Sequence, residues 1–173
     1  MSTTTNDDQL AEIRRRIDRL EGFAQADTAA DGPRIRRHVD ALRREEASVL
    51  VAPDRLDEKL GQLKTRLAVA ENSVVADVSD EWTAFARAVE DELRSWDTYL
   101  ERLQATAATK DGSARERAEA AIADLRTRRI AVCDRLAQAR RDVNGAWYVQ
   151  RNHVSAARDE LEQKADELSA KIM

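Results

Sequence analysis

The sequence predicts an all-α protein: an elongated antiparallel helical hairpin, or coiled coil, with two shorter N-terminal helices packed at its open end. Composition is the first observation behind this, because 36% of the 173 residues are charged and only 4% are aromatic, as is typical of long helices. The second is that apolar residues recur every three or four positions along most of the chain. The third is a pair of turn signals, DTAADGP and TKDGS, that interrupt this periodicity.

The N-terminal part is predicted to be a pair of helices over residues 7–52, after a disordered polar tail at residues 1–6. The first helix spans residues 7–24 and carries a stripe of apolar residues at helical spacing. The second begins at Pro33, because proline suits the first turn of a helix. It ends before Pro53, because a proline there removes a backbone donor.

Residues 53–173 are predicted to form the hairpin, with its turn at residues 109–113, and to make one structural unit with the N-terminal pair. Each arm carries an apolar stripe that recurs about every 3.6 residues, which is the period of an α-helix. Two amphipathic helices joined by so short a turn are expected to fold back on each other. The predicted seam between the arms contains Leu60, Leu67, Val74, Val78, Trp82, Phe85, Val89, Trp96, Leu100, Ala118, Ile122, Leu125, Val132, Leu136, Val143, Trp147, Val154 and Leu161.

Each arm also contains a segment that weakens a helix, and the predicted fold-back places the two segments at the same level. Residues 72–79 are rich in β-branched and capping residues, and the second arm contains an asparagine–glycine pair. A glycine inside a helix costs about 1 kcal/mol relative to alanine. We therefore predict a hinge that contains Asn72, Ser73, Asn144 and Gly145. The alternative is that both segments break completely, which gives a compact six-helix bundle.

Motifs that carry chemistry are missing from the sequence. It contains no glycine-rich phosphate loop, no Cys-x-x-Cys pair and no Gly-x-Ser-x-Gly turn. A di-metal site in a helical bundle needs Glu-x-x-His, but Ile35 and Gln150 stand three positions before His38 and His153. The carboxylates lie beside arginines at helix-surface spacing, so we expect them to be solvated and ionised. The sequence therefore predicts a protein that is not an enzyme and that binds no cofactor or metal.

The charge pattern and the lack of long apolar runs limit the partners. The net charge is −4, with acids and bases interspersed, so nucleic acid is not an expected partner. No apolar run approaches the ~18 residues of a membrane span, and the N-terminus MSTTTNDDQL lacks the apolar core of a signal peptide. We therefore expect a cytoplasmic protein, and the preference for arginine over lysine favours a bacterial source.

These patterns favour a helical scaffold, an adaptor or a self-assembling coiled-coil protein that acts through its helix surfaces. The expected partner is another protein or a second copy of the chain in a homo-oligomer. The alternative is a protein that binds a lipid or membrane surface with its first helix, where arginines at 14–16 lie near an apolar face. Carboxylates in the same segment reduce its attraction to anionic lipid. This candidate partner or membrane face contains Leu10, Ile13, Ile17, Leu20 and Phe23.

Overall fold

The computed structural model of the chain describes residues 3–26, 32–77, 79, 81–142 and 147–172. These ranges contain helices and no strand, so the predicted all-α class is confirmed. The α-helices are α1 (Thr3–Ala26), α2 (Gly32–Leu50), α3 (Leu56–Asp77), α4 (Trp82–Ala108), α5 (Gly112–Arg141) and α6 (Trp147–Ile172), and a short 3₁₀ helix, η1 (Pro53–Arg55), precedes α3.

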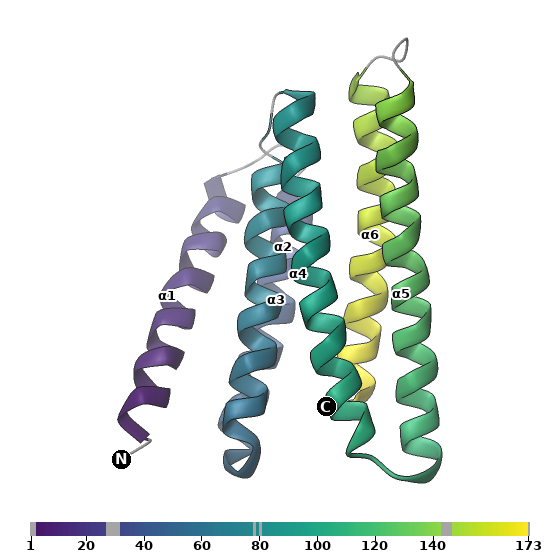
Figure 1. Ribbon diagram of the computed structural model, residues 1–173. Coiled ribbons are helices and arrows are strands. Elements are labelled where there is room, and N and C mark those ends of the chain that lie inside the picture. The colour runs from purple at the N-terminus through teal and green to yellow at the C-terminus, as the bar shows by residue number, and fades with distance from the viewer. Residues whose placement is uncertain (1–2, 27–31, 78, 80, 143–146, 173) are drawn as a thin grey trace.

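The helices alternate in direction, so that each runs antiparallel to the one before it (Figure 1). Every helix packs against its neighbour in sequence, and α1 also contacts α3, which closes a three-helix unit of α1, α2 and α3. The helices α3, α4, α5 and α6 form the rest of the bundle, in which α4 contacts both α5 and α6. The helix α3 therefore belongs to both parts and forms the wall between them.

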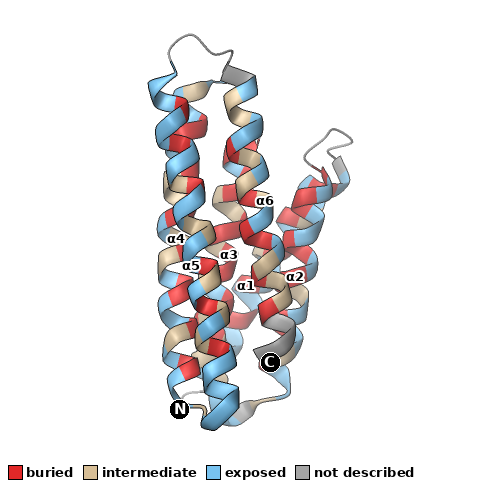
Figure 2. Ribbon diagram, turned by 90° about the vertical axis from the view of Figure 1, so that its right-hand side faces the viewer, coloured by how far each residue is buried: buried red, intermediate tan, exposed pale blue. Residues whose placement is uncertain are grey.

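Two hydrophobic clusters correspond to these two parts, and buried positions lie on the helix faces turned toward neighbouring helices (Figure 2). A fully buried leucine or isoleucine stabilises the fold by about 1.5–3 kcal/mol. The N-terminal cluster contains Leu10, Ile13, Ile17, Leu20, Ala24, Ile35, Val39, Leu42, Val49, Leu60, Leu63, Leu67, Ala70 and Val74. The C-terminal cluster contains Val69 and Ala76 of α3 with Phe85, Val89, Trp96, Leu100, Ile122, Leu125, Val132, Leu136, Val154, Leu161 and other residues of α4, α5 and α6.

The single long hairpin predicted from the sequence is replaced by shorter antiparallel pairs. The helix α3 ends at Asp77, α4 begins at Trp82, and the two pack against each other; α5 and α6 do the same on either side of residues 142–146. This is the compact six-helix alternative. A two-helix hairpin would leave one side of each long helix without cover, and helices gain most of their stability from packing an apolar face. The extra packing outweighs the loss of a few helical hydrogen bonds.

Two of the four predicted hinge residues lie within a helix. Asn72 and Ser73 lie inside α3 rather than at its end. Ser73 is buried, and the side-chain amide of Asn72 donates to Ser95 Oγ of α4 at 3.0 Å. Both therefore help to hold α3 in the bundle, and the helix continues past them. Asn144 and Gly145 lie outside the described residues.

The apolar stripes located the buried positions correctly, but the predicted pairing of the two arms is wrong. The prediction puts Leu60 and Leu161 in one seam between the arms, yet Leu60 belongs to the N-terminal cluster and Leu161 to the C-terminal cluster. Among the predicted seam residues Trp82 is half-buried, while Val78, Val143 and the side chain of Trp147 lie outside the described residues. The buried ones are Leu60, Leu67, Val74, Phe85, Val89, Trp96, Leu100, Ala118, Ile122, Leu125, Val132, Leu136, Val154 and Leu161.

The break between α4 and α5 falls within residues 109–113, the range of the predicted turn. The helix α4 ends at Ala108 and α5 begins at Gly112, whose φ of 53° is in the left-handed region. Only glycine adopts this conformation without strain from a Cβ atom.

No helix in the described ranges is long and apolar enough to cross a membrane.

Candidate functional site

Two groups of charged side chains are candidates for a functional site: a buried ionic cluster between α2, α3, α4 and α6, and a surface groove between α4 and α5. The cluster is centred on Arg158 of α6, which is 2% exposed at its side chain. Its Nε donates to Glu92 Oε2 of α4 at 2.8 Å, and its Nη1 donates to Asp77 Oδ1 of α3 at 2.9 Å. Its Nη2 also donates to Ser73 Oγ at 2.8 Å. One guanidinium thus joins three helices.

The charge of Arg158 is maintained by its partners. Burial by itself lowers the pKa of a guanidinium, but Glu92 and Asp77 raise the pKa of Arg158 above its ordinary value. Arg34 of α2 pairs with the same Oδ1 oxygen of Asp77, and its Nε donates to Asp159 Oδ1 of α6 at 2.9 Å. Asp77, the last residue of α3, therefore lies between two arginines.

Arg66 of α3 also belongs to the buried ionic cluster and contacts residues of α4 and α6. Its guanidinium carbon lies 4.7 Å from the ring centroid of Trp96 and 5.7 Å from that of Tyr99, both on α4. A cation over an aromatic face at this range is attracted by the ring quadrupole. Arg66 Nη2 also donates to Asp166 Oδ1 of α6 at 3.0 Å, and the Tyr99 hydroxyl donates to Glu45 Oε1 of α2 at 2.9 Å.

His38 of α2 and Glu162 of α6 meet inside the same cluster. His38 Nδ1 lies 2.9 Å from Glu162 Oε1, and their side chains are 1% and 3% exposed. Burial raises the pKa of a carboxyl, but His38, Arg66 and Arg37 outweigh it and lower the pKa of Glu162 to about 2. Glu162 is therefore held as the ionised carboxylate.

The ionic cluster forms most of the contact between α2 and α6. Neither hydrophobic cluster contains residues of both helices. Four polar contacts join them instead, at 2.6–3.9 Å: Arg34 and Arg37 with Asp159, His38 with Glu162, and Arg44 with Asp166. Ion pairs need defined geometry, so the cluster fixes how α6 sits against the three-helix unit.

The buried ionic cluster contradicts the expectation that the carboxylates are solvated. Glu45, Asp77, Glu92 and Glu162 are all buried. A signal for part of it exists in the sequence, because Arg158, Glu162 and Asp166 recur every four residues beside the apolar stripe of α6. The described residues contain no group of three or more His, Cys, Asp and Glu side chains arranged to hold a metal ion.

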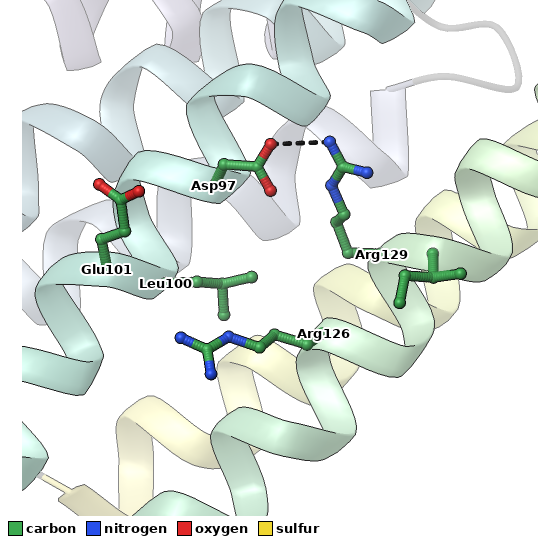
Figure 3. A pocket seen from close by; sticks show the side chains of 6 residues that line it. Asp97, Leu100, Glu101, Arg126 and Arg129 are labelled. Carbon is green, nitrogen blue, oxygen red and sulfur yellow. Dashed lines mark hydrogen bonds and ion pairs between the residues drawn. The ribbon is translucent and has the colours of Figure 1, made fainter.

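The second feature is a groove of about 440 Å³ between α4 and α5, lined by Asp97, Leu100 and Glu101 of α4 and by Arg126, Arg129 and Ile130 of α5. The acids come from one wall and the arginines from the other (Figure 3). Arg129 Nη2 donates to Asp97 Oδ2 at 2.7 Å across the groove. Arg126 extends from α5 toward α4 below Leu100 (Figure 3).

An exposed branched side chain lies at the edge of this charged groove. Ile130 is 55% exposed, whereas Leu100 on the opposite wall is 3% exposed and belongs to the C-terminal cluster. Glu101 and Arg126 are exposed. Among the groove residues drawn in Figure 3, the marked interaction joins Asp97 to Arg129 and none joins Glu101 to Arg126.

The candidate partner face of the first helix is mostly covered. Leu10, Ile13, Ile17 and Leu20 are buried in the N-terminal cluster, against α2 and α3. Phe23 is 50% exposed. A lipid surface could reach the four buried residues only if α1 left the bundle.

No protein-family model, curated protein or solved structure matches this chain.

Proposed function

We propose that this chain is a non-enzymatic helical scaffold that binds a protein partner through the α4–α5 groove. The observation that carries the proposal is Ile130, a branched apolar side chain of α5 that is 55% exposed at the edge of a groove lined by acids of α4 and arginines of α5. Protein interfaces commonly have an apolar centre and a polar rim. The groove combines both in a small area.

The charges around Ile130 support a partner of defined orientation. Asp97 and Glu101 give one wall of the groove a negative charge, and Arg126 and Arg129 give the other a positive charge. Complementary charges at an interface mainly guide association and reject wrong orientations. A partner that follows the groove would therefore present a basic row to α4 and an acidic row to α5.

The buried ionic cluster supports a role as a rigid platform. Arg158 and Arg34 tie α2, α3, α4 and α6 to one another through Asp77, Glu92 and Asp159. Replacing a buried ion pair by apolar residues often leaves stability unchanged or improves it, so such pairs are better explained by specificity of packing than by stability. We infer that the cluster selects one arrangement of the helices and so keeps α4 and α5 in place.

The experiment that tests the proposal is site-directed photo-cross-linking of the full chain in the cells from which the sequence comes. A photoreactive amino acid replaces Ala123, which is exposed on α5 two helical turns before Ile130. The control position is Ala11, which is exposed on α1. We expect a discrete adduct from position 123 and none from position 11.

Two matched substitutions complete this experiment. Ile130→Glu places a charge in the groove, whereas Phe23→Glu does the same at a residue of similar exposure on α1. The adduct from position 123 should disappear with Ile130→Glu and persist with Phe23→Glu. The proposal is wrong if position 123 gives no adduct, or if both substitutions affect the adduct equally.

A further inference from the structure

We infer that the partner at the α4–α5 groove is a second copy of this chain, related to the first by a two-fold axis parallel to the helix axes. This inference rests on the proposed function and specifies its partner. A foreign partner would need a basic row and an acidic row of its own at matching heights. The groove of a second copy already carries both.

The two walls of the groove are matched in height. Because α4 and α5 are antiparallel, Asp97 lies level with Arg129, as their 2.7 Å ion pair demonstrates. One turn further along, Glu101 of α4 and Arg126 of α5 line the same groove. Each level of the groove thus has an acid on α4 and an arginine on α5.

This arrangement distinguishes between the two-fold axes that could relate two facing copies. An axis parallel to the helices preserves height and exchanges left and right, so α4 of one copy faces α5 of the other. Glu101 then faces Arg126 of the other copy, and this contact occurs twice, as it must in a two-fold interface. An axis perpendicular to the helices in the interface plane opposes α4 to α4, which brings acids toward acids and arginines toward arginines.

The apolar residues suit the same arrangement. With the parallel axis, Ile130 of each copy comes onto the α4 side of the other, about one helical turn from Leu100, which also lines the groove. Ala123 and Ala137 lie two helical turns on either side of Ile130 and are also exposed. Small side chains at these positions let α5 of one copy approach α4 of the other closely enough for Ile130 to be covered.

The test uses two charge reversals, Glu101→Arg and Arg126→Glu, in the full chain. The mass of the wild-type chain, followed by sedimentation over a concentration series, should rise from one copy to two. Each reversal alone places like charges at both symmetry-related contacts and should raise the dimer dissociation constant at least ~10-fold. Arg19→Glu, at an exposed residue of α1, is the control and should leave the dissociation constant unchanged.

The decisive measurement is an equal mixture of the two variants. In a mixed dimer the introduced arginine faces the introduced glutamate, and the remaining Arg126 faces the remaining Glu101. We therefore expect the mixture to regain dimers of wild-type affinity, with one copy of each variant. Circular dichroism of each variant should match the wild-type spectrum, which shows that weaker association does not come from unfolding.

The inference is overturned if the wild-type chain remains a single copy up to about 1 mM, which corresponds to less than ~4 kcal/mol of association free energy. It is also overturned if the mixture associates no better than either variant alone. These results leave the proposed function open to its own test. A cross-link from position 123 to a different protein supports the groove as a binding site and contradicts the second copy as its occupant.

Discussion

Arg158 of α6 donates from Nη1 to Asp77 Oδ1 at 2.9 Å and so ties the middle of the last helix to the final residue of α3. Both side chains are almost completely buried, at 2% and 1% exposure. The contact lies where the chain leaves α3 before returning as α4. The position at which the predicted long helix breaks is therefore linked to a residue about eighty positions further along the chain.

Removal of Arg158 should strongly destabilise the bundle. Arg158→Met keeps much of the side-chain volume but removes the cation that pairs with buried Glu92 and one of the two that pair with buried Asp77. Breaking a buried ion pair by removing one partner costs about 3–5 kcal/mol. The free energy of unfolding, measured by urea denaturation, should fall by that amount. Arg115→Met removes an exposed arginine from a pair with Glu119 and should leave the denaturation midpoint almost unchanged.

Glu162 should make stability depend on pH in the acidic range. Its pKa in the folded protein is about 2, below the ordinary value of 4.5. The unfolded chain thus binds the proton more tightly, so the stabilising contribution is complete above about pH 4.5 and is lost as the pH falls toward 2. We expect Glu162→Gln to lower the free energy of unfolding at pH 7 by roughly 3 kcal/mol.

The difference between wild type and Glu162→Gln isolates this effect. Burial raises the pKa of the neighbouring Asp166, so Asp166 has the opposite influence on the pH dependence, but it is present in both proteins. Urea denaturation at pH 7, 4 and 3 should show the difference becoming smaller with each step. A difference that stays constant over these conditions would show that Glu162 is not held in its ionised form by the fold.

Two glycines should respond oppositely to alanine. Gly112 has a φ of 53°, and a Cβ atom there meets nothing within 4 Å, so Gly112→Ala is opposed by backbone strain alone. We expect a loss of about 1–2 kcal/mol. Gly22 lies in α1 and also has open space around its Cβ position, without a positive φ. Gly22→Ala should therefore stabilise the protein by up to about 1 kcal/mol. Thermal denaturation measures both effects. The prediction is wrong if the two variants shift the denaturation midpoint in the same direction.

The first helix should contribute to stability through its buried stripe and not through Phe23. Ile17 has no exposed surface, whereas Phe23 is 50% exposed. Ile17→Ala should cost about 2–5 kcal/mol, the range for a large-to-small change in a core. Phe23→Ala should cost much less, because its ring is already half in water. Equal losses in urea denaturation would mean that α1 packs in a different rotation from the one described.

Part of this fold follows from the sequence because it depends on local chemistry. Pro33 and Pro53 bound α2 closely, and Gly112 marks the turn between α4 and α5. The apolar stripes also predict which positions are buried, since a helix that carries such a stripe must cover it. Each of these features needs only residues that are near one another in the chain.

The choice between a long hairpin and a compact bundle depends on the tertiary structure. Both satisfy the same stripes, because a stripe specifies which face of a helix is covered but not which helix covers it. The helix α3 is buried against α1 and α2 on one side and against α4 on the other. This double cover stabilises the break after Asp77. The residues at 72–79 weaken a helix, but they do not determine by themselves whether it bends or breaks.

The ionic cluster and the groove depend on tertiary structure for the same reason. Glu92 and Glu162 resemble the many solvated carboxylates of the chain, and only their closeness to Arg158, His38 and Arg66 makes their burial favourable. Ile130 likewise is one of several apolar residues that stay exposed because of how the helices pack. The positions of the helices and of their apolar faces follow from short-range geometry, so both can be read from the sequence. The partner of each face was decided by packing between helices that are distant in sequence.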